Sequence, residues 1–490
     1  MAANTTSSNL TAAFVDLATY DEPEKYFYGG TDAVTYFVKK LRKATWFSVA
    51  PCVLAISGGN PGFGQSWGYK ISRAGDYLLR TWLRVQLPSV ELASVYSAQQ
   101  EGNIVPGTSW AWSDCALRWT RNLGHNLIRE INISFNDLVA ERMDSFYLDF
   151  WAAFTVPAGK RNGYNNMIGN IPVLNNPCSV LPSSGSSYTI RKLPPAILDI
   201  PLPFFYSRDT GIALPTAAIP YNDMIHYVTF RDIGDVLNVD NINWSNVDGF
   251  SGNYTVPAQR TMLVDQQLNL PVDMWAEYAI VSNVERTQMG KAPRDILIEQ
   301  VQTAPRTQYT PSNVAQTDIR FAHSIKALFF SVRNKTVLSE YSNYTSGQVV
   351  PYPTGLDFFP GYASDPIRQT SLLYENTARL VNMGSDYFSL IVPWYNAVSI
   401  PTETGYHLMS YTLDLVNTNP MGSTNYGKLT NVSFQFGASD AAIASSTAPS
   451  DATAARINGA PVLQTFETIV VGVNHNIVRI SGGALGFPIL

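Results

Sequence analysis

The chain has 490 residues, more than the roughly 250 to 300 at which a single hydrophobic core stops growing, so we expect at least two cores. Its 33 basic and 38 acidic residues give a net charge of −5 without a long basic block, which argues against direct nucleic-acid binding over a large face. No segment approaches the roughly 18 to 20 apolar residues of a membrane span, and the first residues lack the pattern of a signal peptide.

Strand signals recur along the whole chain, and long helical periodicity is scarce. Seven segments rich in β-branched and aromatic residues predict strands: Tyr77–Gln86, Leu127–Asn136, Met224–Arg231, Trp275–Ser282, Ala327–Arg333, Leu408–Val416 and Phe466–Asn474. Glycine-rich and Asn-rich sequences between them predict turns at Ser57–Gly62, Asn162–Gly163, Pro182–Gly185 and Asn419–Gly422. The best helix candidate is Asp144–Phe154, where Asp144 can cap the first turn and a Phe recurs at every fourth residue.

The two halves of the chain contain a weak internal repeat. Four blocks match in the same order: Ile71–Val85 with Ile319–Arg333, Ile133–Trp151 with Leu372–Trp394, Tyr221–Phe230 with Tyr426–Phe436, and Trp275–Gly290 with Phe466–Gly482. Chance matches would not keep their order, so the repeat indicates two copies of one domain. In each half a stretch without clear pattern follows the third block, and we expect both stretches, Ile233–Leu270 and Gly437–Leu463, to be surface loops.

An all-β domain of this size has to protect its sheet edges, and the eight-stranded jelly roll is one solution. We therefore predict an all-β fold with two tandem eight-stranded jelly rolls and short helices in the loops. The expected domains are an N-terminal arm at residues 1–43, a first jelly roll at 44–290 and a second at 291–490. The arm has no counterpart before the second copy, and its aromatic residues and basic end, Lys39–Lys43, suit contact with a partner protein or an anionic membrane surface.

The sequence contains no motif that indicates catalysis or ligand binding, so we predict no catalytic, cofactor-binding or metal site. The five histidines are isolated from one another, and Cys52, Cys115 and Cys178 have no metal-binding or disulfide spacing. The pair Cys115 and His125 lacks a nucleophile signature. The remaining candidates read as turn glycines, an Asx-type turn and solvated carboxylates: Gly62, Gly64 and Gly68; Ser207–Gly211; and the pairs Asp144 with Asp149 and Asp137 with Glu141.

Long contiguous segments carry a family resemblance. They are Tyr26–Gly30, Thr35–Phe47, Ile71–Leu79, Leu148–Thr155, Ile200–Asn222, Ile296–Arg306, Asn419–Asn431 and Arg479–Leu490. On these segments the chain closely resembles the major capsid proteins of iridescent viruses, within the nucleocytoplasmic large DNA viruses, and is closest to those of invertebrate iridescent viruses.

The resemblance implies a structural, non-enzymatic shell protein with a double jelly roll. It further implies homotrimeric pseudo-hexagonal capsomers that form the icosahedral capsid of the virion, assembled in the host cytoplasm over an internal membrane. The expected partners are copies of the chain, minor capsid proteins and, through the arm, the inner viral membrane or its proteins, with no direct nucleic-acid contact.

Jelly rolls also serve other functions, so the fold alone does not decide between them. The alternative is a carbohydrate-binding jelly-roll module, which exposed Trp244, Trp275 and Trp394 would support. We expect these three side chains to fill cores instead. An enzyme on a β scaffold is a third possibility, and it lacks a motif.

Overall fold

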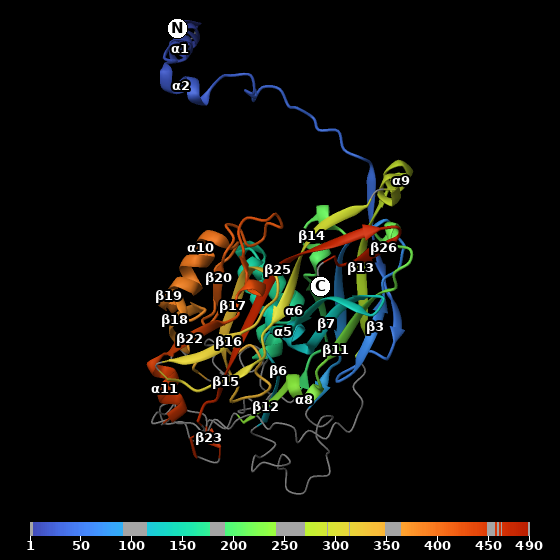
Figure 1. Cartoon of the computed structure of the whole chain (residues 1–490), viewed down its shortest axis with the longest axis vertical. Helices are drawn as coiled ribbons and strands as arrows, with labels where there is room; N and C mark the ends of the chain where they lie inside the picture. Colours follow the sequence, from blue (N-terminus) through green and yellow to red (C-terminus); the bar gives the residue numbers. More distant parts are fainter. Residues whose placement is uncertain are drawn as a thin grey trace. The chain divides into compact units, whose positions relative to one another are not determined.

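Figure 1 shows the computed structural model of the chain. The structure describes residues 3–91, 115–176, 192–241, 270–291, 293–312, 314–347, 364–447, 456–457, 460–461 and 463–488. Contacts within the chain divide it into two units, residues 1–46 and residues 47–490. The first unit contains helices α1 (Ala3–Ala18) and α2 (Glu22–Phe27). Helix α1 was not predicted from the sequence, because its Asn, Thr and Ser residues favour turns and caps over helix interiors.

The second unit begins with a jelly roll of two antiparallel sheets, called roll 1. Its four-stranded sheet has the order β1-β13-β4-β10, and its five-stranded sheet has the order β2-β3-β11-β7-β8. The bounds are β1 Phe47–Val53, β2 Ala55–Gly58, β3 Ser66–Lys70, β4 Tyr77–Leu87, β7 Ile128–Phe135, β8 Leu138–Asp144, β10 Ala196–Leu202, β11 Met224–Phe230 and β13 Val272–Val281. Apolar side chains from both sheets belong to one core cluster, so the sheets face each other across it.

A second jelly roll, roll 2, follows with the same strand order. One sheet has the order β14-β25-β17-β20 with short β15, β21 and β26 attached, and the other has the order β16-β22-β18-β19. The bounds are β14 Arg294–Thr303, β15 Thr307–Tyr309, β16 Ala315–Ile319, β17 Ser324–Asn334, β18 Ile367–Tyr374, β19 Thr377–Gly384, β20 His407–Ser410, β21 Thr424–Asn425, β22 Val432–Ala438, β25 Phe466–Ser481 and β26 Ala484–Gly486.

The two rolls match strand for strand. The order β1-β13-β4-β10 corresponds to β14-β25-β17-β20, and β3-β11-β7-β8 corresponds to β16-β22-β18-β19. Each pair of blocks in the sequence repeat falls on corresponding strands: β4 with β17, β7 and β8 with β18 and β19, β11 with β22, and β13 with β25. The predicted double jelly roll is therefore confirmed.

Short helices and minor strands lie in the connections. The helices are α4 Leu123–Leu127, α5 Ser145–Thr155, α6 Ala158–Ile168, α7 Pro172–Asn175, α8 Ile233–Val236, α9 Asn283–Lys291, α10 Val392–Asn396 and α11 Asp440–Thr447, with 3₁₀ or π turns η3 Phe205–Ser207, η4 Thr210–Ile212, η5 Thr216–Ala218, η6 Tyr387–Ile391 and η7 Tyr426–Lys428. The strands are β5 Val90–Glu91, β6 Cys115–Trp119, β9 Lys192–Leu193, β12 Leu237–Asn241, β23 Arg456–Ile457 and β24 Ala460–Pro461. Within the described ranges, no helix combines the length and apolar character needed to cross a membrane.

Six of the seven predicted strands lie on strands of the sheets, and the predicted helix is α5. The seventh, Leu408–Val416, is a strand only as far as Ser410, because the chain then turns at Tyr411 and leaves the sheet. The predicted turn at Asn162–Gly163 is wrong, since both residues lie inside α6, which packs on β10 and ends at Gly169 in the left-handed conformation. Pro182–Gly185 lies outside the described residues.

The two stretches predicted as loops contain helices and strands where the structure describes them. Ile233–Asn241 forms α8 and then β12, which pairs with β6. In the second stretch, β22 continues to Ala438, and α11 then buries the side chain of Ala442 completely. An Ala/Ser-rich sequence has little hydrophobic contrast, so its pattern does not reveal such a helix. Residues 242–269 and 448–455 lie outside the described part of the chain.

Strand β17 is buried on both of its faces. Phe330 and Val332 point into the core of roll 2, whereas Ala327 and Phe329 belong to the core cluster that extends into roll 1. This explains why its sequence reads as a nearly continuous apolar run without the alternation of a half-exposed strand. In Figure 1, α5 of roll 1 lies between β17 and β25 of roll 2 and the strands of roll 1.

Candidate functional site

Helix α5 forms the junction between the two rolls. It starts where β8 ends, with Asp144 as its N-cap accepting a 2.9 Å hydrogen bond from the backbone N–H of Tyr147. One turn apart, Phe150 and Phe154 stack on Phe329 of roll 2, with ring centroids 5.9 and 5.5 Å away. Rings at these separations contribute about 0.5–1.5 kcal/mol per pair beyond the area that they bury. The junction is therefore a hydrophobic interior like that of each roll.

A buried cluster of charges ties α5 to two strands of roll 2. Glu299 on β14 accepts hydrogen bonds from Arg208 at 3.0 Å and from Lys326 of β17 at 2.5 Å. Arg208 also donates to the Tyr147 hydroxyl at 2.5 Å, and these charged side chains are no more than 4% exposed. Removing one partner would leave a buried charge unpaired, at a cost of about 3–5 kcal/mol. The cluster therefore fixes which surfaces of the two rolls meet.

Further polar contacts cross the junction. Arg118 on β6 pairs with Glu340 of roll 2 with both side chains 1% exposed, and Asn238 donates to the same carboxylate oxygen at 3.1 Å. The Asn222 side chain of roll 1 donates to the backbone carbonyl of Leu485 in β26 at 3.3 Å and accepts from its N–H at 3.0 Å. These bonds satisfy polar groups that the contact would otherwise bury without partners.

Glu141 on β8 lies beside this charge cluster and has a strongly perturbed acidity. Its Oε2 accepts the backbone N–H of Phe205 at 2.8 Å, while its buried Oε1 has no partner among the described residues. Burial raises the pKa of Glu141 to about 8, against the opposing effect of Arg208. Burial thus favours the protonated, neutral form of Glu141.

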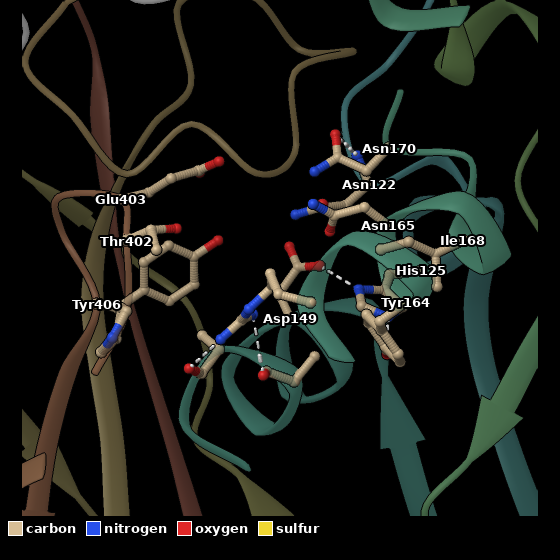
Figure 2. A pocket seen from close by; sticks show the side chains of 14 residues that line it. Asn122, His125, Asp149, Tyr164, Asn165, Ile168, Asn170, Thr402, Glu403 and Tyr406 are labelled. Atoms are coloured by element: carbon tan, nitrogen blue, oxygen red, sulfur yellow. Dashed lines mark hydrogen bonds and ion pairs between the residues drawn. The ribbon is translucent and has the colours of Figure 1, made fainter. Parts of the chain in front are cut away.

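A small cavity at the junction contains a His–Asp pair (Figure 2). His125 Nδ1 lies 2.6 Å from Asp149, and His125 Nε2 lies 2.7 Å from the Tyr164 hydroxyl. Asp149 also accepts from Ser342 at 2.5 Å and from Tyr344 at 3.1 Å, which links α5 to roll 2. The cavity has a volume of about 50 Å³, far below the roughly 300–1,000 Å³ of ligand pockets. Both nitrogens of the His125 ring have hydrogen-bond partners, so the pair links α4, α5 and α6 at the junction.

Roll 2 brings Ser385, His407 and Asp365 together, a set that the sequence analysis did not single out. His407 Nε2 lies 2.7 Å from Ser385 Oγ and 2.8 Å from Asp365, and Ser385 also donates to Asp365. A nucleophilic triad needs the serine and the carboxylate on different ring nitrogens. Here one nitrogen faces both, and the buried Nδ1 has no partner among the described residues. The set is therefore a hydrogen-bond cluster with no relay.

The carboxylates considered for glycoside hydrolysis have other roles in the structure. Asp144 caps α5, Asp149 binds His125, and Asp137 lies at the tight turn between β7 and β8 with a positive φ of 66°. The expectation that Glu141 and Asp149 are solvated charges is wrong, because each is 2% exposed. Gly64 has a positive φ of 68° next to Asp232, as a turn requires. No group of three or more potential metal ligands occurs in the described ranges.

The three tryptophans have different surroundings. Trp275 is half-buried and stacks on Trp82 at 6.1 Å, and Trp244 lies outside the described residues. The expectation that Trp394 fills a core is wrong, because this side chain on α10 is 71% exposed. Its short helix is held to roll 2 by Val392 and Pro393, which leaves the opposite side of the helix uncovered.

Comparisons with known proteins cover nearly the whole chain. Residues 35–281 match a family model described as "Major capsid protein N-terminus", and residues 285–486 match one described as "Large eukaryotic DNA virus major capsid protein". The chain belongs to this major capsid protein family.

Individual relatives agree with this assignment. Major capsid proteins of Costelytra zealandica iridescent virus, Invertebrate iridescent virus 6 and Frog virus 3 are 53%, 50% and 40% identical, each over 99% of both chains. Among solved structures, the PBCV-1 virus capsid matches with a TM-score of 0.66 at 18% identity, over 93% of this chain and 100% of that one. The Faustovirus major capsid protein matches with a TM-score of 0.64 at 11% identity, over 98% and 99%. The resemblance to iridescent-virus capsid proteins is confirmed.

Membership of this family makes the chain a structural protein of the virion capsid, and its relatives are non-enzymatic. The junction around α5 then has a mechanical role, since it joins two similar rolls into one body through a continuous core. In a shell protein, the functional site is a contact surface of this kind. The sequence could not locate it, because Tyr147, Phe150 and Phe329 look like residues of any core.

Glu141 provides a pH test of the junction. The Glu141 carboxyl has a pKa of about 8 in the folded chain and an ordinary pKa of 4.5, so it adds stability that is fully present below pH 4.5 and is lost as the pH rises through 8. Glu141→Gln mimics the protonated form and removes this dependence. We expect the unfolding free energy of the variant, relative to that of the natural chain, to be higher at pH 9 than at pH 5. The increase is about 1.4 kcal/mol for each unit by which the folded and unfolded pKa values of Glu141 differ within this range. Urea unfolding at both values measures this, and an equal difference at pH 5 and pH 9 would contradict it.

Proposed function

We propose that three copies of this capsid protein form a pseudo-hexagonal capsomer, and that these capsomers tile an icosahedral shell assembled in the host cytoplasm. The supporting observation is the strand-for-strand correspondence of the two rolls. Two similar rolls per chain make six similar units per trimer, which approximate six-fold symmetry around a three-fold axis. A contact between roll 2 of one copy and roll 1 of the next is heterologous, and such contacts close into a ring.

The trimer has a direct test in solution. We expect the purified full-length chain to sediment at three times its mass of 54.0 kDa across the low micromolar range. Analytical ultracentrifugation at several concentrations measures this. A single species of 54.0 kDa at every concentration would contradict the proposed capsomer.

We also propose that the chain divides into an arm at residues 1–43 and rolls at 44–290 and 291–490, and that the arm joins the capsomer to minor capsid proteins or the inner viral membrane. Helix α1 supports this, because Leu10, Phe14 and Leu17 recur at helical spacing and form an apolar stripe. The basic run Lys39–Lys43 adds a second signal, since each cation contributes roughly 1 kcal/mol near an anionic membrane.

Deletion of residues 1–43 tests the arm. We expect the shortened chain to form trimers with thermal stability close to that of the full chain, because β1 begins only at Phe47. In cells that express the other virion proteins, the same variant is expected to leave shells incomplete, as seen by electron microscopy. Aggregated or unfolded protein would place the segment in the core of roll 1, and complete shells would remove its proposed role.

The carbohydrate-binding alternative keeps one supporting observation, the exposed Trp394 and its neighbour Tyr395, which is 77% exposed. Such rings can stack on sugars, but sugar sites also place polar groups around the ring to fix orientation. The neighbours of these two residues on α10 and η6 are mainly apolar, including Leu390, Ile391 and Val398. This composition fits a protein contact better.

A further inference from the structure

Roll 2 exposes an apolar surface around α10, here called the α10 patch. It consists of Leu390, Ile391, Trp394, Tyr395, Val398 and Leu413, whose exposed fractions are 51%, 45%, 71%, 77%, 48% and 71%. The segment with Leu413 is fixed beside the helix, since Asn396 donates to the Thr412 carbonyl at 2.8 Å and accepts from the Leu415 N–H at 2.8 Å. A contiguous apolar surface of this kind usually marks a protein contact.

Roll 1 has an apolar groove of about 560 Å³ over its four-stranded sheet, here called the roll 1 groove. Its lining comes from β4, β10, α5 and α6 and includes Trp82, Trp151, Val156, Met167, Pro201 and Pro203. Its charged residues Arg80 and Glu277 pair with each other. The buried Oδ1 of Asp199, also in the lining, has no hydrogen-bond partner among the described residues. The groove thus suits an apolar, aromatic surface.

The contact inside the chain shows how a helix covers this type of sheet. The outer face of roll 2's sheet carries Phe329, the sixth of the 11 residues of β17, and α5 of roll 1 stacks on it. On the matching sheet of roll 1, Trp82 of β4 lies in the roll 1 groove. The two strands correspond, since β17 lies between β25 and β20 and β4 lies between β13 and β10.

The helices correspond as well. Helix α5 follows β8 in roll 1, and η6 with α10 follows β19, the matching strand of roll 2. Over roll 2, the end of α5 lies beside the segment after α10, where the Ser399 N–H donates to the Phe154 carbonyl at 3.0 Å. The sheet of roll 2 is thus covered by α5 of roll 1, which lies next to roll 2's own α10. Over roll 1, the groove is lined by its own α5 and α6, and none of the described residues that line the groove comes from roll 2.

We propose that the α10 patch of one copy packs into the roll 1 groove of the next copy. This inference rests on the proposed trimer and names the surfaces that hold it together. Within each chain, α5 of roll 1 packs on the sheet of roll 2. In the proposed contact between copies, α10 of roll 2 packs in the same way on the sheet of roll 1. Trp394 and Tyr395 enter the apolar part of the groove, beside Trp82 and Trp151.

A charge placed in the patch tests this assignment. We expect Trp394→Glu to weaken the trimer by about 30-fold or more in dissociation constant, as for a buried aromatic residue at the centre of an interface. The matched control is Val284→Glu on α9, because Val284 is also 71% exposed but lies outside the patch. Both variants are first checked for an unchanged circular-dichroism spectrum and melting temperature, and ultracentrifugation then gives the dissociation constants.

A photo-crosslink locates the contact independently. A benzophenone amino acid replaces Tyr395, and nitrogen-15-labelled and unlabelled copies are mixed so that mass spectrometry separates links between copies from links within one. The proposal expects links between copies from position 395 to peptides that contain Trp82, Trp151 or Pro201.

The outcomes separate the two proposals. If the natural chain is a monomer, the capsomer and the groove assignment both fail. If it is a trimer that Trp394→Glu leaves intact, or if position 395 links only to other peptides, the groove assignment fails while the trimer stands. Weakening of the trimer by Val284→Glu to the same extent as by Trp394→Glu would also overturn the assignment, since any added charge would then act alike.

Discussion

The packing of α5 against Phe329 is the interaction on which the architecture depends. A jelly roll needs only its two inner faces to fold, so the outer face of roll 2's sheet could have been polar. Instead β17 is apolar on both sides, and α5 places Phe150 and Phe154 on its outer side. Burying such rings is worth about 1.5–3 kcal/mol each, which makes the separation of the two rolls costly. The shell protein therefore behaves as one body with two similar halves.

The polar groups of the junction select its geometry. Apolar packing alone tolerates sliding, whereas Glu299 is satisfied only when Arg208 and Lys326 reach it from the two rolls. The Arg118–Glu340 pair imposes the same requirement at another point of the interface. Such pairs add little net stability over an apolar contact, but a wrong register would leave them unpaired. The proposed capsomer with pseudo-six-fold symmetry requires a fixed angle between the two rolls, because an error in that angle within each chain would be repeated around the ring.

The sequence predicted the fold well and the contact surfaces poorly. Six strands, α5 and the repeat could be read because alternation, an Asp cap and regular Phe spacing are local patterns. Helices α6 and α11 could not, since Gly163 inside α6 and the Ala/Ser run of α11 hide helices that are fixed by packing. Trp394 and Phe329 illustrate the limit for the site: both are large aromatic residues after apolar neighbours, yet one is exposed and the other buried. Only the three-dimensional arrangement of the two rolls decides which.

Helix α5 couples the stability of the two rolls, and hydrogen exchange of the backbone amides measures this coupling. Phe150→Ala changes only roll 1's helix, leaving every residue of roll 2 as it was. If α5 holds the rolls together, the amides of β17 and β25 in roll 2 will exchange faster in this variant, with their opening free energy lowered by about 3 kcal/mol or more. Unchanged protection of β17 and β25, with loss confined to roll 1, would contradict the account.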